Sequence, residues 1–107
     1  DPAVGRDGAP RCAACGVALK PDIVFFGEPI PEDVRREAFA AARASDVMLV
    51  VGTRGEVMPA GLLPWEAKRS GAYVIEVNPE PSAYTPTLTD VFLPGTAAEV
   101  LPALTGA

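Results

Sequence analysis

Two cysteines, Cys12 and Cys15, have the most readily defined chemistry in this sequence of 107 residues. Gly16 follows them and would let the backbone turn so that both sulfurs face one point, as in one half of a Cys₄ zinc knuckle. Two thiolates fill half of a tetrahedral zinc shell, so a zinc site would need a second pair from outside this chain. A redox pair or two unligated thiols are the alternatives that remain open.

Gly52, Thr53 and Asn78 form a second candidate group, because they directly follow two apolar runs at 47–51 and 73–77. In an open parallel sheet, ligands bind in the crevice at the carboxyl ends of the strands, and a glycine there lets a phosphate or ribose approach the backbone. These residues therefore favour a nucleotide site. The alternative is that they are ordinary connections between strands and helices.

The elements that would position these residues form a βαβ unit. Both runs are rich in β-branched residues and almost wholly apolar, with Glu76 the one charged residue among them, which is typical of parallel strands covered on both faces. Between them lie a loop at 52–59, a helical piece ending near Gly71 and two helix-compatible prolines, Pro59 and Pro64. The sequence thus predicts an α/β fold with a parallel sheet.

The remaining elements are predicted from local signals. Residues 1–10 are expected to be a flexible lead-in, and residues 23–26 a first buried strand. A helix is expected over 32–44, with acidic residues in its first turn. A short strand is expected at 91–93. Thr96 and Glu99 form a capping box for a last helix, which Pro102 should shorten or kink.

Composition excludes several classes of function. The net charge of −5 argues against binding to a nucleic-acid backbone, which requires clustered basic residues. No histidine is present, so this chain cannot itself supply an imidazole base or a histidine metal ligand. No apolar run approaches the roughly 20 residues of a membrane-spanning helix, and no signal peptide opens the sequence. We therefore expect a cytoplasmic protein without membrane or nucleic-acid partners.

Six short motifs follow one another from about residue 10 to the end of the chain, and together they resemble the C-terminal half of the sirtuins, the NAD-dependent protein-lysine deacylases. The motifs are Cys12-x-x-Cys15-Gly16; Lys20-Pro21-Asp22-Ile23-Val24-Phe25-Phe26-Gly27-Glu28; Gly52-Thr53 with Val57-x-Pro59-Ala60; Leu63-Pro64 with Ala67-Lys68; Gly71-Ala72 with Val74-Ile75-Glu76-Val77-Asn78; and Gly95-x-Ala97 with Glu99-Val100-Leu101-Pro102.

The resemblance implies a partial doubly wound, Rossmann-like sheet with helices on its faces, and half of a zinc-knuckle module at the N-terminus. Residues 1–20 would be the lead-in and the half zinc module, and residues 21–107 half of an NAD-binding domain. Cys12 and Cys15 would hold a structural zinc. The residues implied to contact NAD are Gly52, Thr53, Arg54, Asn78, Glu80, Thr96 and Ala97.

The resemblance also implies a substrate. An acyl-lysine protein or peptide would enter as a strand between two segments of the chain, with Phe26 lining the acyl-lysine tunnel. The implied contact residues are Val24, Phe26, Gly27, Glu28, Glu56 and Val57. At positions 54 and 55 the family commonly has serine and an apolar residue, whereas this chain has Arg54 and Gly55. Arg54 could clamp a phosphate, pair with Glu56 or obstruct the crevice.

We assign no catalytic residue to this chain, because the family's histidine base and Gly-Ala-Gly loop are not in it. The resemblance predicts the cofactor- and peptide-binding portion of a deacylase, presented as a fragment or truncated product and inactive alone. A non-catalytic nucleotide-binding or docking module is the alternative. A middle-domain relative of thiamine-dependent enzymes would leave the cysteine pair unexplained. A half-sheet would expose apolar faces, so we expect dimerisation or aggregation.

Overall fold

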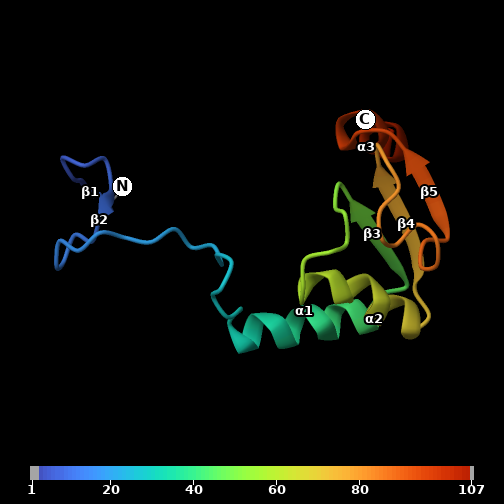
Figure 1. The fold of residues 1–107 in the computed structure, drawn as a ribbon, viewed down its shortest axis with the longest axis horizontal. Helices are drawn as coiled ribbons and strands as arrows, with labels where there is room; N and C mark the ends of the chain where they lie inside the picture. The colour runs from blue at the N-terminus through green and yellow to red at the C-terminus, as the bar shows by residue number, and fades with distance from the viewer. Residues whose placement is uncertain (1–2, 107) are drawn as a thin grey trace. The chain divides into compact units, whose positions relative to one another are not determined.

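A computed structural model describes residues 3–106 of the chain. Figure 1 shows the elements coloured along the sequence. The chain divides into two compact units, Asp1–Ile30 and Pro31–Ala107. The division falls ten residues later than the boundary expected after residue 20.

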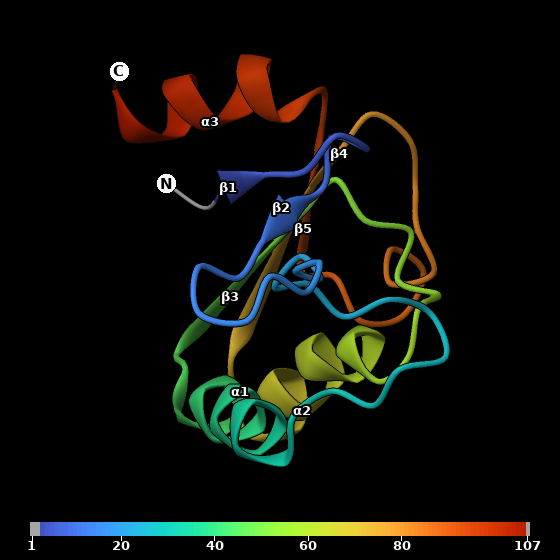
Figure 2. The same cartoon turned by 90° about the vertical axis from the view of Figure 1, so that its left-hand side faces the viewer.

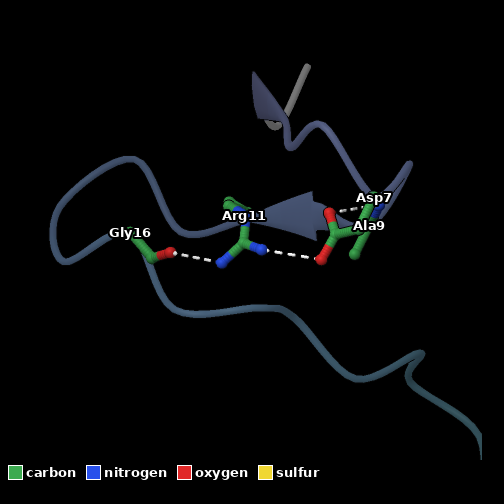
Figure 3. A network of polar contacts seen from close by, with 4 residues as sticks. All are labelled: Asp7, Ala9, Arg11 and Gly16. Carbon is green, nitrogen blue, oxygen red and sulfur yellow. Dashed lines mark hydrogen bonds and ion pairs between the residues drawn. The ribbon is translucent and has the colours of Figure 1, made fainter.

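The first unit contains more structure at its start than expected. The strands β1 (Ala3–Val4) and β2 (Pro10–Arg11) pair antiparallel, so a flexible lead-in over residues 1–10 is wrong from Ala3 onward; residues 1–2 lie outside the described part. Arg11 stabilises this hairpin and the turn after it. Its guanidinium donates to Asp7 Oδ2 at 2.8 Å and to the carbonyl of Gly16 at 3.2 Å, as Figure 3 shows.

The predicted strand at 23–26 is also wrong. The segment forms bends and a turn rather than a strand, and the side chains of its four apolar residues are 46–92% exposed. Composition favoured a strand, but a strand requires a neighbouring backbone, and this segment pairs with none in the described part of the chain. Hydrogen bonds from Lys20 Nζ to the carbonyls of Pro21 and Ile23 hold the bend instead.

The second unit is built on a three-stranded parallel sheet in the order β3–β4–β5. The strands are β3 (Val47–Val51), β4 (Tyr73–Asn78) and β5 (Val91–Pro94), with Val47 opposite Tyr73 and Ile75 opposite Val91. The three predicted strands in this unit, and their parallel direction, are therefore confirmed. The fold is mixed α/β.

Three helices accompany this sheet. They are α1 (Glu32–Ala44), α2 (Leu63–Arg69), which follows a 3₁₀ turn at Ala60–Leu62, and α3 (Ala97–Thr105). In both views α3 lies at the carboxyl ends of the strands, and α1 and α2 lie together toward the other end (Figures 1 and 2). No helix in residues 3–106 combines the length and apolar character needed to cross a bilayer.

Small side chains let the first two helices pack closely. Ala42 of α1 and Ala67 of α2 are buried with Ala72, against Met48 of β3. Arg43 and Glu66 pair across the two helices at 3.6 Å. The helix α2 ends in a Schellman motif, in which Gly71 has φ +100° and the N–H of Ala72 reaches the carbonyl of Ala67 at 3.0 Å.

The main core lies on one face of the sheet. Val50 and Val74 are buried there with Tyr84 and Leu88, which belong to the long connection between β4 and β5. Because side chains alternate along a strand, Val47, Leu49 and Tyr73 point to the other face. They are 55%, 47% and 49% exposed. The sheet therefore carries the core on one side and is open over β3 and the start of β4 on the other.

Candidate functional site

Asn78 joins the loops that follow all three strands. It ends β4, and its side-chain amide donates to the carbonyl of Thr53, in the loop after β3, at 2.7 Å. Its own carbonyl accepts from the N–H of Gly95, just after β5, at 3.1 Å. The N–H of Gly52 donates to the carbonyl of Val77 at 3.0 Å. The predicted convergence of these loops at one edge of the sheet is thus present in the structure.

The loop after β3 is turned tightly by two glycines. Gly52 and Gly55 have φ of +65° and +77°, which favours glycine strongly over residues with a Cβ. The hydroxyl oxygen of Thr53 accepts from the N–H of Gly55 at 3.1 Å, and the carbonyl of Arg54 accepts from Ala83 at 3.0 Å. The backbone of this loop is therefore held by one hydrogen bond within the loop and by one from the connection between β4 and β5.

Of the three alternatives for Arg54, the structure shows the ion pair. Its Nε lies 3.6 Å from Oε2 of Glu56, and the two side chains are 85% and 65% exposed. Exposed pairs of this kind contribute little, about 0–1 kcal/mol, because water competes for both charges. The ion pair with Glu56 therefore restrains the Arg54 guanidinium only weakly.

The other residues predicted for this site lie on the loops that Asn78 brings together. Thr96 is the N-cap of α3, its hydroxyl accepts from the N–H of Glu99 at 3.3 Å, and Ala97 opens the helix. The Glu99 carboxylate in turn accepts a hydrogen bond from the N–H of Thr96 at 2.9 Å. This bond confirms the capping box and lowers the pKa of the Glu99 carboxyl. Glu80 follows β4 by two residues and is exposed.

A pocket of about 270 Å³ opens beside the loop after β3. Its wall is mainly apolar, and Thr53 is among the residues that line it. Tyr84, from the connection between β4 and β5, also lines it. An aromatic side chain in a polar connection is the signal that could have identified it, since large aromatic residues dominate buried surfaces.

The cysteine pair lies in a tight turn of the first unit. The N–H of Gly16 donates to the carbonyl of Cys12 at 2.9 Å, and Gly16 has φ +74°. Backbone N–H groups of Cys15 and Ala14 point at the Cys12 sulfur and lower the pKa of that thiol. Stabilising the thiolate is what a metal-binding turn requires, so these two residues fit half of a zinc site. Residues 3–106 hold no cluster of three or more possible metal ligands.

The predicted peptide-binding residues lie in both units. Phe26 is 92% exposed, Val24 is 47% exposed, and Gly27 has φ +87°. The carboxylate of Glu28 accepts from the N–H of Phe25 at 3.2 Å and pairs with Lys20, and the two contacts lower its pKa. In the second unit, Glu56 and Val57 are exposed.

Comparison with known proteins decides the family. A model of the Sir2 family matches residues 3–59, which is more than half of the chain. The chain belongs to the Sir2 family. A relative in Pyrobaculum aerophilum, named NAD-dependent protein deacylase 2, is 55% identical over 95 residues, covering 89% of this chain and 38% of the relative. This Sir2-family chain thus spans about two fifths of the length of that relative.

Solved structures agree with this assignment. A Sir2 homologue in complex with NAD superimposes with a TM-score of 0.83 at 40% identity, covering 92% of this chain and 38% of that one. Sir2Af2 bound to a myristoylated histone peptide gives a TM-score of 0.81 at 42% identity, covering 94% and 42%. Within the Sir2 family, the predicted α/β architecture of this portion is therefore confirmed.

Proposed function

We propose that this Sir2-family chain forms the cofactor- and peptide-binding portion of an NAD-dependent protein-lysine deacylase. The observation that carries the proposal is the convergence at Asn78 of the loops after three parallel strands, since such an edge is where open α/β sheets bind nucleotides. The similar Sir2 homologue solved with NAD supports the choice of ligand.

In this proposal each loop contacts a different part of the dinucleotide. Gly52, Thr53 and Arg54 would bind the phosphates and a ribose, Asn78 and Glu80 the adenosine ribose, and Thr96 and Ala97 the adenine. Arg54 could leave Glu56 for a phosphate at little cost, because its ion pair is exposed. When bound, NAD supplies the ribose carbon to which the acyl group is transferred as nicotinamide leaves.

The peptide would be held through its main chain. The proposed contacts are Val24, Phe26, Gly27 and Glu28 of the first unit, and Glu56 and Val57 of the second. A peptide that enters as an added strand is recognised mainly by backbone hydrogen bonds, so little sequence preference is expected. The exposed Phe26 ring would then cover the acyl-lysine side chain. The myristoylated peptide complex of Sir2Af2 supports this class of partner.

A complete deacylase of this kind has two features that these 107 residues do not supply. The sequence contains no histidine to act as base, and its two cysteines complete only half of a tetrahedral zinc site. We propose that other polypeptide segments supply both. The open sheet face of Val47, Leu49 and Tyr73 suggests that a partner, or a second copy of this chain, covers it. Sedimentation velocity over a range of concentrations would detect self-association.

An NMR titration of the labelled chain with NAD tests the cofactor proposal. We expect the largest shift changes at Gly52, Thr53, Asn78 and Gly95, and none at Thr87, an exposed residue of the β4–β5 connection. Chemical-shift changes that are spread evenly over the chain, or that are absent at the highest NAD concentration, would contradict the proposed site. A parallel assay with an acetyl-lysine peptide and NAD should show no turnover, and turnover by the isolated chain would contradict the assignment of the base to another segment.

A further inference from the structure

Glu76 is a completely buried carboxylate in the middle of β4. Its Oε2 accepts hydrogen bonds from the hydroxyls of Thr89, at 2.7 Å, and Thr85, at 2.8 Å. Burial alone would raise the pKa of Glu76, but the polar side chains around its carboxylate, the Thr89 and Thr85 hydroxyls among them, outweigh that effect and keep its pKa below the ordinary value. The group is therefore an ionised acceptor that holds the connection between β4 and β5.

The other oxygen of this carboxylate, Oε1, is buried and has no hydrogen-bond partner among the described residues. A buried charged oxygen without a donor is unfavourable for folding, and an apolar residue at this position would avoid the cost. Stability of the core alone therefore does not account for Glu76. Its contacts with the connection between β4 and β5 are the feature that a carboxylate provides and an apolar side chain does not.

That connection in turn supports the loop after β3. Tyr84 lies in it, is 2% exposed, and donates its hydroxyl to the carbonyl of Gly61 at 2.9 Å. Its ring packs so closely on Gly55 that a Cβ there would fall 2.6 Å from two ring atoms. Next to it, the N–H of Ala83 donates to the carbonyl of Arg54 at 3.0 Å. Contacts therefore run from Glu76 to the backbone of Arg54 and Gly55.

We propose that Glu76 is a positioning residue for the proposed NAD site. Its hydrogen bonds with Thr85 and Thr89 hold Tyr84 and Ala83 in contact with the loop after β3. Tyr84 and Ala83 then set the backbone conformation from Thr53 to Gly55. The identity of the ligand as NAD rests on the proposed function, whereas the role of Glu76 in supporting the loop does not. Glu76 itself would contact neither the dinucleotide nor the peptide.

Amide hydrogen exchange on the full chain without ligand tests the support of the loop. Thr89→Val removes one donor to Glu76, Thr89→Ser retains it, and Thr87→Val is a matched control in the same connection. For Thr89→Val we expect the N–H groups of Gly55 and Ala83 to exchange about five- to tenfold faster, as the loss of about one net hydrogen bond implies. Thr89→Ser and Thr87→Val should leave both rates unchanged.

The N–H of Ala72, which closes α2 by bonding to the carbonyl of Ala67 at 3.0 Å, reports on general stability. Equal acceleration at Ala72, or no change at Gly55 and Ala83, would overturn the inference. Glu76→Gln, which removes the charge but keeps the shape, should act in the same direction as Thr89→Val.

An NAD titration then separates the two proposals. If the parent chain binds NAD, Thr89→Val should raise the dissociation constant by a similar factor, and Thr87→Val should not. An unchanged constant would overturn the link between Glu76 and the cofactor. If the parent chain fails to bind NAD, the proposed function fails, while the exchange rates at Gly55 and Ala83 still decide whether Glu76 positions the loop.

Discussion

Replacing Gly55 with alanine should be one of the most damaging single-methyl changes in the second unit. Two separate costs follow from the structure. Gly55 has φ +77°, and left-handed backbone costs a residue with a Cβ about 1–2 kcal/mol. The new Cβ would also lie 2.6 Å from Cε2 and Cζ of Tyr84, a ring that cannot retreat without losing its bond to Gly61. Overpacking of this kind costs about 1–3 kcal/mol more.

Gly52→Ala is the matched control for this prediction. Gly52 lies in the same loop with φ +65°, but an added Cβ there would meet nothing within 4 Å. We therefore expect a loss of about 1–2 kcal/mol in the free energy of unfolding for Gly52→Ala, and about 2–5 kcal/mol for Gly55→Ala. Urea denaturation followed by circular dichroism measures both values, provided that the m-values agree.

A double-mutant cycle identifies the source of the difference. In a Tyr84→Leu background the ring is gone, so Gly55→Ala should cost about as much as Gly52→Ala does in the parent. The reasoning is refuted if Gly55→Ala is no worse than Gly52→Ala, or if its cost is the same with and without the Tyr84 ring. Either result would mean that the contact between the loop and the ring is not a tight one.

Three further predictions concern other parts of the chain. The bond from Lys68, with the N–H of Val74, holds the pKa of Asp90 below its ordinary value of 3.8. A carboxyl whose pKa is lower in the folded than in the unfolded state stabilises the fold above about pH 4, and this contribution is lost as the pH falls through the folded-state pKa. Asp90→Asn should therefore be less stable than the parent near pH 7. In urea titrations at acid pH, its free energy of unfolding should approach that of the parent. A constant difference from about pH 7 to about pH 2 would contradict this. Thr96→Ala should lower the free energy of unfolding by about 1 kcal/mol through loss of the cap, while Thr96→Ser should not, and equal losses would contradict the capping role. Metal analysis of the purified monomer should find well below one zinc per chain, and Cys12→Ser should abolish any zinc shared between two chains; a full equivalent in a proven monomer would contradict the half site.

Local signals in the sequence predicted several elements correctly. The helix at Glu32–Ala44 and the strand at Val47–Val51 have the predicted bounds, and Thr96 caps α3 as its spacing with Glu99 indicated. In each case the determining contacts lie within a few residues or follow from a continuous apolar run. The helix α3 continues past Pro102 to Thr105, because a proline there removes only one backbone donor and leaves the capped first turn unaffected; whether it shortens or kinks the helix stays a prediction.

The failures concern contacts between segments that are distant in sequence. The residues at 23–26 have strand composition, yet composition cannot supply a neighbouring backbone. The connection between β4 and β5 has turn composition, yet it carries Tyr84 and Leu88, two of the largest buried side chains. Polar residues nearby obscured this, because Thr85 and Thr89 bond to Glu76, and Ser82 bonds to Thr85 within the connection.

The proposed NAD site shows why such contacts matter for function as well as for stability. Residues at the carboxyl ends of parallel strands can be predicted from strand positions alone, and Asn78 joins their loops as expected. The conformation of each loop, however, depends on what lies behind it. For the Thr53–Gly55 backbone that support is the buried carboxylate of Glu76 and the ring of Tyr84, which lie about 21 to 31 residues away in sequence. A nucleotide site on this sheet is therefore specified by two sets of residues: those at the strand ends, whose spacing is visible in the sequence, and those beneath them, whose role follows only from the packing.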